Sequence, residues 1–140
     1  MTTTAIDSNI LIDIVSADPT FGPSAKAALE TCAQEGALIV CPEVVAEFAT
    51  GCSSAADSLL ILELLKINYR DIGMPAAAQA GEVRSRKNKG GRILADYLIA
   101  VHAAAHADRL LTRDSGFARL DIPGLVVVTP PSLIAGDSEN

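Results

Sequence analysis

Four acidic residues have a spacing that lets them act together: Asp7, Glu47, Asp96 and Asp114. Asp7 follows the short apolar stretch 3–6, and Asp114 follows the apolar stretch 110–112. Converging carboxylates with no Lys or Arg between them destabilise a fold unless they are protonated or bind a cation. Because carboxylate oxygens are hard ligands, the cation they favour is Mg²⁺ or Mn²⁺. The pattern therefore predicts chemistry based on acids and a divalent cation.

Taken singly, these acids also have structural explanations. Asp96 falls in the first turn of a predicted helix, where free amides and the helix dipole favour a carboxylate. Asp7 can bind the amides of a turn, after which Ser8 or Asn9 is expected to cap a helix. Glu47 stands among apolar neighbours, which favours an orientation into a cleft. Only their convergence would distinguish a functional site from these local roles.

Short apolar strands alternate with helices along the chain. The strands are predicted at 3–6, 37–40, 67–72, 109–112 and 125–128, and the helices at 10–14, 24–34, 42–50, 55–65, 74–89 and 95–107. This alternation predicts an α/β fold with one parallel, doubly wound sheet of about five strands and helices on both faces. Asp7 and Asp114 then lie at the carboxyl ends of strands, where such sheets bind ligands. Glu47 and Asp96 lie on helices that begin at this edge.

The length of 140 residues, 49% of them hydrophobic, fits one domain with a sizeable core. We expect this domain to cover residues 1–135 and residues 136–140 to form a disordered tail. No stretch reaches the roughly 18 apolar residues of a membrane span, and the start of the chain lacks a secretion signal. We therefore expect a cytoplasmic protein without membrane contact. Cys32, Cys41 and Cys52 lack the spacing of a disulfide framework or zinc site.

The net charge of −6 argues against general nucleic-acid binding, but the positive charges are concentrated. Five of the eleven Lys and Arg residues precede the Asp96 helix closely: Arg84, Arg86, Lys87, Lys89 and Arg92. Such a run is either a solvated helix end or, beside an acidic cluster, a surface that holds a phosphate backbone.

Three other polar residues are expected to have structural roles. His102 and His106 form an i, i+4 pair, but Ala103 stands where the zinc motif HExxH has its Glu. The helical angle directs the pair away from Asp96, so we expect a surface or interface role. Asp13 is expected to be a surface or helix-end charge.

Four segments together resemble the PIN-domain ribonucleases and, within them, the VapC-type toxins of bacterial toxin–antitoxin pairs. They are IDSNILID at 6–13, PEVVAE at 42–47, ADYLIA at 95–100 and LTRDSGF at 111–117. Each segment is weak evidence alone, but their order, intervals and coverage of nearly the whole chain make the resemblance specific. It implies a three-layer PIN-like domain.

The resemblance also implies a site and an activity. The acidic site of the family falls on Asp7, Glu47, Asp96 and Asp114, of which Asp7, Asp96 and Asp114 are the expected metal ligands. Ser8 and Thr112 occupy positions for supporting hydroxyls. The implied reaction is hydrolysis of RNA by water activated by Mg²⁺ or Mn²⁺, which leaves a 5′-phosphate and a 3′-hydroxyl. The basic run would then bind the RNA backbone.

The implied partners are the RNA substrate, a cognate antitoxin protein and a second copy of the chain in a homodimer. The leucine-rich segment 59–65 is either a candidate interface or a core helix. Two other functions stay open: a catalytically silent PIN-like scaffold that binds a partner, and a phosphoryl-transfer enzyme built on Asp7. The second fits less well because Asp7-Ser8-Asn9 lacks the second acid of an Asp-x-Asp motif. No glycine-rich phosphate loop supports a nucleotide-binding module.

Overall fold

A computed structural model describes residues 1–87 and 91–133, which form a five-stranded sheet in the order β3-β2-β1-β4-β5. The strands are β1 (Thr4–Ile6), β2 (Leu38–Val40), β3 (Ile67–Tyr69), β4 (Arg109–Leu111) and β5 (Val127–Val128). Every neighbouring pair is parallel. The predicted α/β class and parallel sheet are therefore confirmed.

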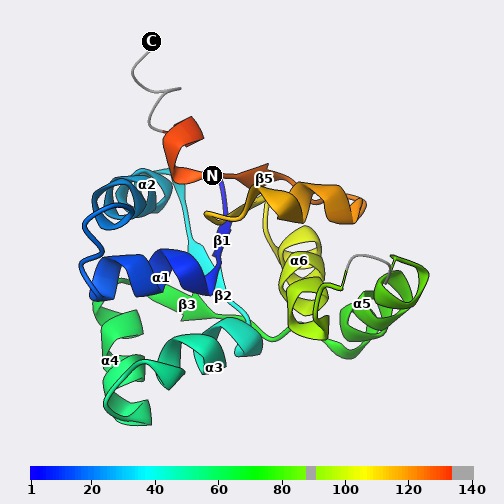
Figure 1. Ribbon diagram of the computed structural model, residues 1–140, viewed down its shortest axis with the longest axis horizontal. Helices are drawn as coiled ribbons and strands as arrows, with labels where there is room; N and C mark the ends of the chain where they lie inside the picture. Colours follow the sequence, from blue (N-terminus) through cyan, green and yellow to red (C-terminus); the bar gives the residue numbers. More distant parts are fainter. Residues whose placement is uncertain (88–90, 134–140) are drawn as a thin grey trace.

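Helices cover both faces of the sheet, which gives the predicted three layers (Figure 1). They are α1 (Ser8–Val15), α2 (Gly22–Glu35), α3 (Pro42–Thr50), α4 (Ala55–Leu64), α5 (Met74–Lys87) and α6 (Leu94–His106). In Figure 1, α1 and α2 lie on one side of β1, and α5 and α6 lie on the other. In the part of the chain described, no single helix is long and apolar enough to cross a membrane; only the bent pair α3 and α4, at 116°, meets that test jointly.

The core forms where the two central strands meet a helix on each face. Ile6 in β1, Leu110 in β4, Leu11 in α1 and Ile99 in α6 are all buried. The helices α1 and α6 lie on opposite sides of β1 (Figure 1). Burial of such side chains provides most of the free energy of folding. At Gly36, a β-carbon would lie 2.1 Å from the backbone oxygen of Thr2, so only glycine permits this close approach.

The third strand is shorter than the predicted 67–72. The Arg70 amide still donates to the Val40 oxygen of β2 at 3.0 Å, but the carbonyl groups of the chain after Tyr69 bind α6. The Nε2 atoms of His102 and His106 donate to the backbone oxygens of Arg70 (2.9 Å) and Ile72 (2.7 Å). His102 is 1% exposed. The predicted surface or interface role is therefore wrong for His102, which is buried and anchors this link, while His106 is half-buried.

Other boundaries differ by a few residues. A 3₁₀ helix, η1 (Ser115–Leu120), follows β4 where only a turn was predicted. The side chain of Asp114 caps it by accepting a hydrogen bond from the Gly116 amide at 2.9 Å. The predicted helix end with Lys89 and the predicted tail 136–140 lie outside the described residues.

Candidate active site

Asp7 lies where the two central strands end side by side. β1 pairs with β4 in a register that aligns Ile6 with Leu111, so the next residues, Asp7 and Thr112, are neighbours across the sheet. The Thr112 hydroxyl donates to Asp7 Oδ2 at 2.7 Å, and the Ser8 amide donates to Asp7 Oδ1 at 2.7 Å. Asp7 is thus the N-cap of α1, a role predicted for Ser8 or Asn9.

The folded chain destabilises the ionised form of Asp7. The side chain is buried, and this burial raises the pKa of the carboxyl group, while the hydrogen bonds from Thr112 and Ser8 lower it. The carboxylates of Glu47 and Asp96 raise the pKa further. Glu47 and Asp96 therefore each disfavour the ionised form of Asp7.

Hydroxyl and amide groups connect Asp7 to its surroundings. Ser8 Oγ donates to Glu47 Oε1 at 3.0 Å, which holds the exposed Glu47 at the edge of the site. Asn9 Nδ2 donates to Thr112 Oγ1 at 3.2 Å and to Asp7 Oδ2 at 3.3 Å. The sequence analysis identified Ser8 and Thr112 but missed Asn9, although Asn9 directly follows the Asp7-Ser8 pair.

A positive charge lies among the acids, contrary to prediction. Arg92 forms ion pairs with Asp114 Oδ2 at 2.9 Å and with Asp96 Oδ2 at 3.4 Å. Its guanidinium carbon lies 4.9 Å from the centroid of the Phe117 ring. Arg92 was expected to face RNA with the rest of the basic run, but its position four residues before Asp96 brings it back over the first turn of α6.

The donor chemistry at this edge fits a divalent cation, but the side chains are not arranged around one. Carboxylate and hydroxyl oxygens surround Asp7, as Mg²⁺ and Mn²⁺ prefer. Within residues 1–87 and 91–133, no three His, Cys, Asp or Glu side chains are placed to enclose a metal ion. Two expected ligands, Asp96 and Asp114, are paired with Arg92, which would have to move for both to bind a cation.

Two further residues of the basic run form ion pairs within the chain. Arg86 pairs with Glu82 at 3.5 Å, and Lys87 pairs with Asp121 at 3.2 Å. Arg84 is half-buried, and its Nε has no hydrogen-bond partner among residues 1–87 and 91–133. Lys87, Arg92 and Arg119 contribute to the lining of a cavity of about 200 Å³ beside the acids. Arg119 was not predicted, because it lies apart from the basic run in the sequence.

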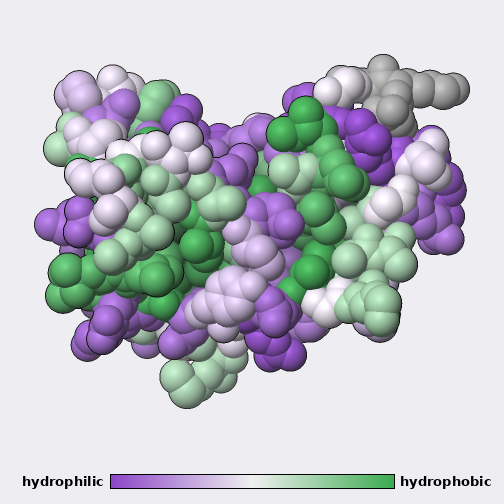
Figure 2. All heavy atoms as spheres, turned by 90° about the horizontal axis from the view of Figure 1, so that it is seen from below, coloured by the Kyte–Doolittle hydropathy of each residue, from purple (hydrophilic) through white to green (hydrophobic). Residues whose placement is uncertain are grey.

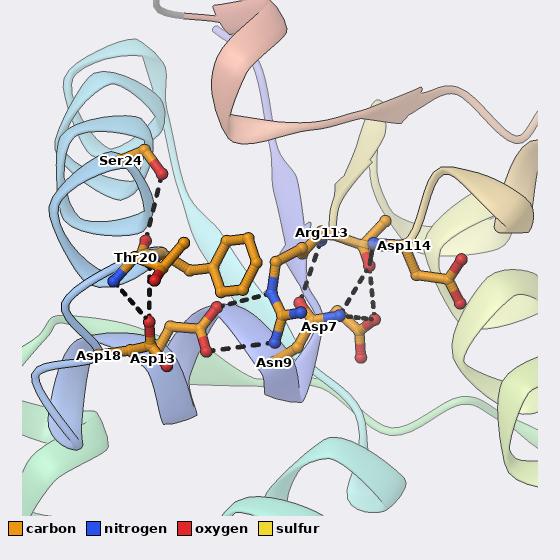
Figure 3. Close-up of polar contacts among 10 residues, drawn as sticks. Asp7, Asn9, Asp13, Asp18, Thr20, Ser24, Arg113 and Asp114 are labelled. Carbon is orange, nitrogen blue, oxygen red and sulfur yellow. Dashed lines mark hydrogen bonds and ion pairs between the residues drawn. The ribbon is translucent and has the colours of Figure 1, made fainter.

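Asp13 lies in the last turn of α1, as a helix-end charge was expected to, but it is buried, so the expected surface position is wrong. Its carboxylate accepts from Arg113 Nε at 2.9 Å and from a terminal nitrogen of the same guanidinium at 3.3 Å. Arg113 also lies over the Phe21 ring, 4.1 Å from its centroid. Figure 3 shows this group beside Asp7, with Asn9 between them. The Arg113 amide donates to Asn9 Oδ1 at 3.1 Å, which connects the pair to the acidic site.

Comparison with known proteins identifies the family. The model of the PIN domain family matches residues 4–123. A toxin–antitoxin complex from Klebsiella pneumoniae contains a chain with 29% identity (TM-score 0.69; coverage 91% of this chain and 97% of that one). VapBC2 from Rickettsia felis, bound to a promoter DNA fragment, contains a chain with 23% identity (TM-score 0.70; coverage 91% of this chain and 98% of that one). VapC20 from Mycobacterium tuberculosis, described as a sarcin–ricin loop cleaving toxin, has 14% identity (TM-score 0.69; coverage 86% of this chain and 97% of that one).

No curated protein sequence matches the chain significantly. The two structures below 25% identity show only that the fold is shared, and this fold agrees with the family model. The family model covers most of the chain, from the first strand to the residues after η1. This chain is therefore a member of the PIN domain family, as the four sequence segments indicated.

Proposed function

We propose that this PIN domain is a metal-dependent endoribonuclease and the VapC-type toxin of a toxin–antitoxin pair. The observation that carries the proposal is the state of Asp7, a buried carboxylate whose pKa is raised by burial and by Glu47 and Asp96. Such an arrangement costs stability unless a cation compensates it. A site that retains it at the ligand-binding edge of a parallel sheet is suited to phosphodiester chemistry with Mg²⁺ or Mn²⁺.

Each residue has a stated role in this proposal. Asp7, Asp96 and Asp114 hold the cation, which when bound polarises the phosphodiester and acidifies an attacking water. Thr112 fixes the orientation of Asp7, and Ser8 fixes that of Glu47. Glu47 accepts the proton of the attacking water. Water attack leaves a 5′-phosphate and a 3′-hydroxyl.

The proposed partners are an RNA substrate, an antitoxin and a second copy of the chain, and the proposed location is the cytoplasm. The Klebsiella pneumoniae structure, at 29% identity, is described as a toxin–antitoxin complex, which supports a protein partner. On α4, Leu59, Leu60 and Leu64 are exposed, whereas Leu62 is buried. Figure 2 shows apolar surface on the side where α4 lies in Figure 1. The segment is thus both core and candidate interface.

One observation favours the silent scaffold as the second candidate. Arg92 neutralises Asp96 and Asp114 within the chain, so these acids do not require an external cation. A scaffold of this kind would bind its partner through the same fold without binding Mn²⁺.

The test is cleavage of defined RNAs and total cellular RNA by the purified chain, free of antitoxin, with Mg²⁺ or Mn²⁺ and with EDTA. The matched variants are Asp96→Asn and Glu30→Gln, which removes an exposed acid on α2. We expect cleavage that leaves 5′-phosphates, persists in Glu30→Gln and is lost with EDTA and in Asp96→Asn. Absence of cleavage together with absence of Mn²⁺ binding would reject the nuclease in favour of the scaffold.

A further inference from the structure

A cavity of about 310 Å³ opens beside the acidic site, on the side of α2. Its lining includes Phe21, Arg113, Ser115 and the pair Pro130 and Pro131. Arg113 and Ser115 directly precede and follow the acidic residue Asp114, so the cavity begins one residue from the acids. Its volume lies at the lower end of the roughly 300–1,000 Å³ found for small-molecule sites.

One wall of this cavity is formed by the planar guanidinium of Arg113, which the buried carboxylate of Asp13 holds in place. Asp13 binds the Arg113 guanidinium through two hydrogen bonds, and its side chain is only 5% exposed. The Arg113 side chain is 41% exposed, so the pair joins a buried acid to a cation that remains open to the cavity. The effect of this pair is to fix the plane of Arg113 against the ring of Phe21.

Phe21 is held by its backbone while its ring stays accessible. Asp18 Oδ1 accepts from the amides of Thr20 (2.9 Å) and Phe21 (2.8 Å), and Ser24 Oγ donates to the Phe21 oxygen at 3.2 Å (Figure 3). Phe21 is nevertheless 39% exposed. An ordered aromatic ring beside an ordered guanidinium offers a stacking surface that loses little conformational entropy when a ligand binds.

We propose that this cavity binds one nucleobase of single-stranded RNA, next to the phosphodiester held at the acids. The proposal rests on the ribonuclease function above. Single-stranded RNA is recognised by stacking of its bases on aromatic rings and guanidinium planes. The Arg113 guanidinium covers one face of the Phe21 ring, so this stacked pair offers a base its outer face, and the Ser115 and Thr129 side chains in the lining provide hydroxyls for the base edge. Through this contact the cavity selects the nucleotide beside the cleavage position.

The test combines a protein variant with an RNA probe that lacks one base. Short fluorescein-labelled oligouridine and oligoadenosine RNAs are bound by the full chain in Ca²⁺, and a single abasic nucleotide is moved along each probe. Phe21→Leu removes the ring but keeps apolar volume, Phe21→Tyr keeps the ring, and Tyr69→Leu removes an exposed ring on β3 as a control. Thermal unfolding verifies that each variant is folded.

We expect Phe21→Leu to weaken binding by about tenfold, with Phe21→Tyr and Tyr69→Leu close to the wild type. At one probe position, loss of the base should weaken wild-type binding by the same factor and leave Phe21→Leu unaffected. Such coupling at one nucleotide is not produced by a general loss of structure. Arg113→Lys, which keeps the charge but not the plane, should act in the same direction.

Uniform weakening with no coupled position would overturn the nucleobase assignment. Unchanged RNA affinity together with weaker binding of a protein partner would assign the cavity to that partner instead. If the wild type cleaves RNA but Phe21→Leu behaves identically to it, the subsite fails and the nuclease stands. If the wild type neither binds nor cleaves any RNA, the proposed function itself fails.

Discussion

At Asp7, the requirements of the site oppose those of the fold. Because burial and two neighbouring acids raise the pKa of Asp7, its ionised form is less stable in the folded chain than in the unfolded chain. We expect Asp7→Asn to raise the free energy of unfolding at pH 7 by about 1–2 kcal/mol while abolishing RNA cleavage. The gain should vanish below about pH 4, where the carboxyl group is protonated in both states.

Urea unfolding in EDTA measures this effect, with Glu30→Gln as the control for loss of an exposed acid. A less stable Asp7→Asn chain would contradict the expectation. It would show that the hydrogen bonds from Thr112 and Ser8 contribute more to stability than the burial of the charge removes.

Arg92 should compete with a cation for Asp96 and Asp114. We expect Arg92→Gln to bind Mn²⁺ about tenfold more tightly, which corresponds to about 1.4 kcal/mol. Gly116→Ala disturbs the same ion pair less selectively, because a β-carbon at this position would lie 2.4 Å from an Arg92 nitrogen and 2.9 Å from Asp114 Oδ1, so it would displace both partners. Titration calorimetry with Mn²⁺ in the absence of RNA measures both.

Arg119→Gln is the matched control, since it removes an exposed arginine from the lining of the same cavity. Weaker Mn²⁺ binding in Arg92→Gln would contradict competition. It would show instead that Arg92 holds Asp96 and Asp114 in a geometry suited to the cation.

Asp7 and Thr112 could be placed together from sequence because each follows a strand, and the carboxyl ends of parallel strands share one edge. Glu47 and Asp96 lie on helices, and they were assigned to the site because these helices begin at this edge and because of the family resemblance. Arg92 and Arg113 could not be placed in this way. Their long side chains reach acids on other parts of the fold, and the direction they take depends on tertiary packing. Asp13 was misassigned for the same reason, since its partner lies 100 residues away in the chain.

Helix α6 carries Asp96 of the acidic site in its first turn and, further along, His102 and His106, which bind the segment that follows β3. Burial lowers the pKa of His102, a direction supported by the nearby charges of His106 and Arg70 and opposed by Glu43 and by the hydrogen bond to the Arg70 oxygen. The unfolded chain therefore binds a proton at a higher pH than the folded one. The contribution of neutral His102 to the free energy of unfolding is therefore present above about pH 6.5, its pKa in the unfolded chain, and is lost as the pH falls below it.

We expect the free energy of unfolding to drop by about 1 kcal/mol between about pH 7 and pH 5.5 through this residue. His102→Gln should flatten this dependence, as measured by urea unfolding across the range. His106→Gln is the control for loss of a hydrogen bond to the same link. An equally steep dependence in His102→Gln would exclude His102 as its source.

The same element explains why strand boundaries were harder to predict than the fold class. Alternating apolar strands and helices suffice to indicate a parallel α/β sheet. β3 ends at Tyr69, and the carbonyl groups after it bind two histidines of α6, which are distant in sequence. The 3₁₀ helix η1 likewise depends on the cap formed by Asp114, whose local sequence fits a turn equally well.

At the scale of the whole molecule, the charge distribution limits how RNA binds. The chain carries a net charge of −6, and Arg86, Lys87 and Arg92 of the basic run are engaged by Glu82, Asp121 and the acids of the site. When a Lys or Arg leaves its acidic partner in the protein to bind an RNA phosphate, the phosphate releases a counterion, but the freed carboxylate takes up another one. Net release of counterions is then small, and the affinity for RNA depends weakly on salt.

We expect the plot of log affinity against log salt for a short oligouridine to have a slope no steeper than about −2, whereas five free cations would give about −3.5. Asp121→Asn tests the cause, because it frees Lys87 from its ion pair. Asp121 has a left-handed backbone (φ 59°), which asparagine also adopts readily. The slope should therefore steepen by about 0.7 in this variant without loss of folding. A wild-type slope near −3.5, unchanged in Asp121→Asn, would mean that the basic run binds phosphates as free charges and that its ion pairs do not persist in solution.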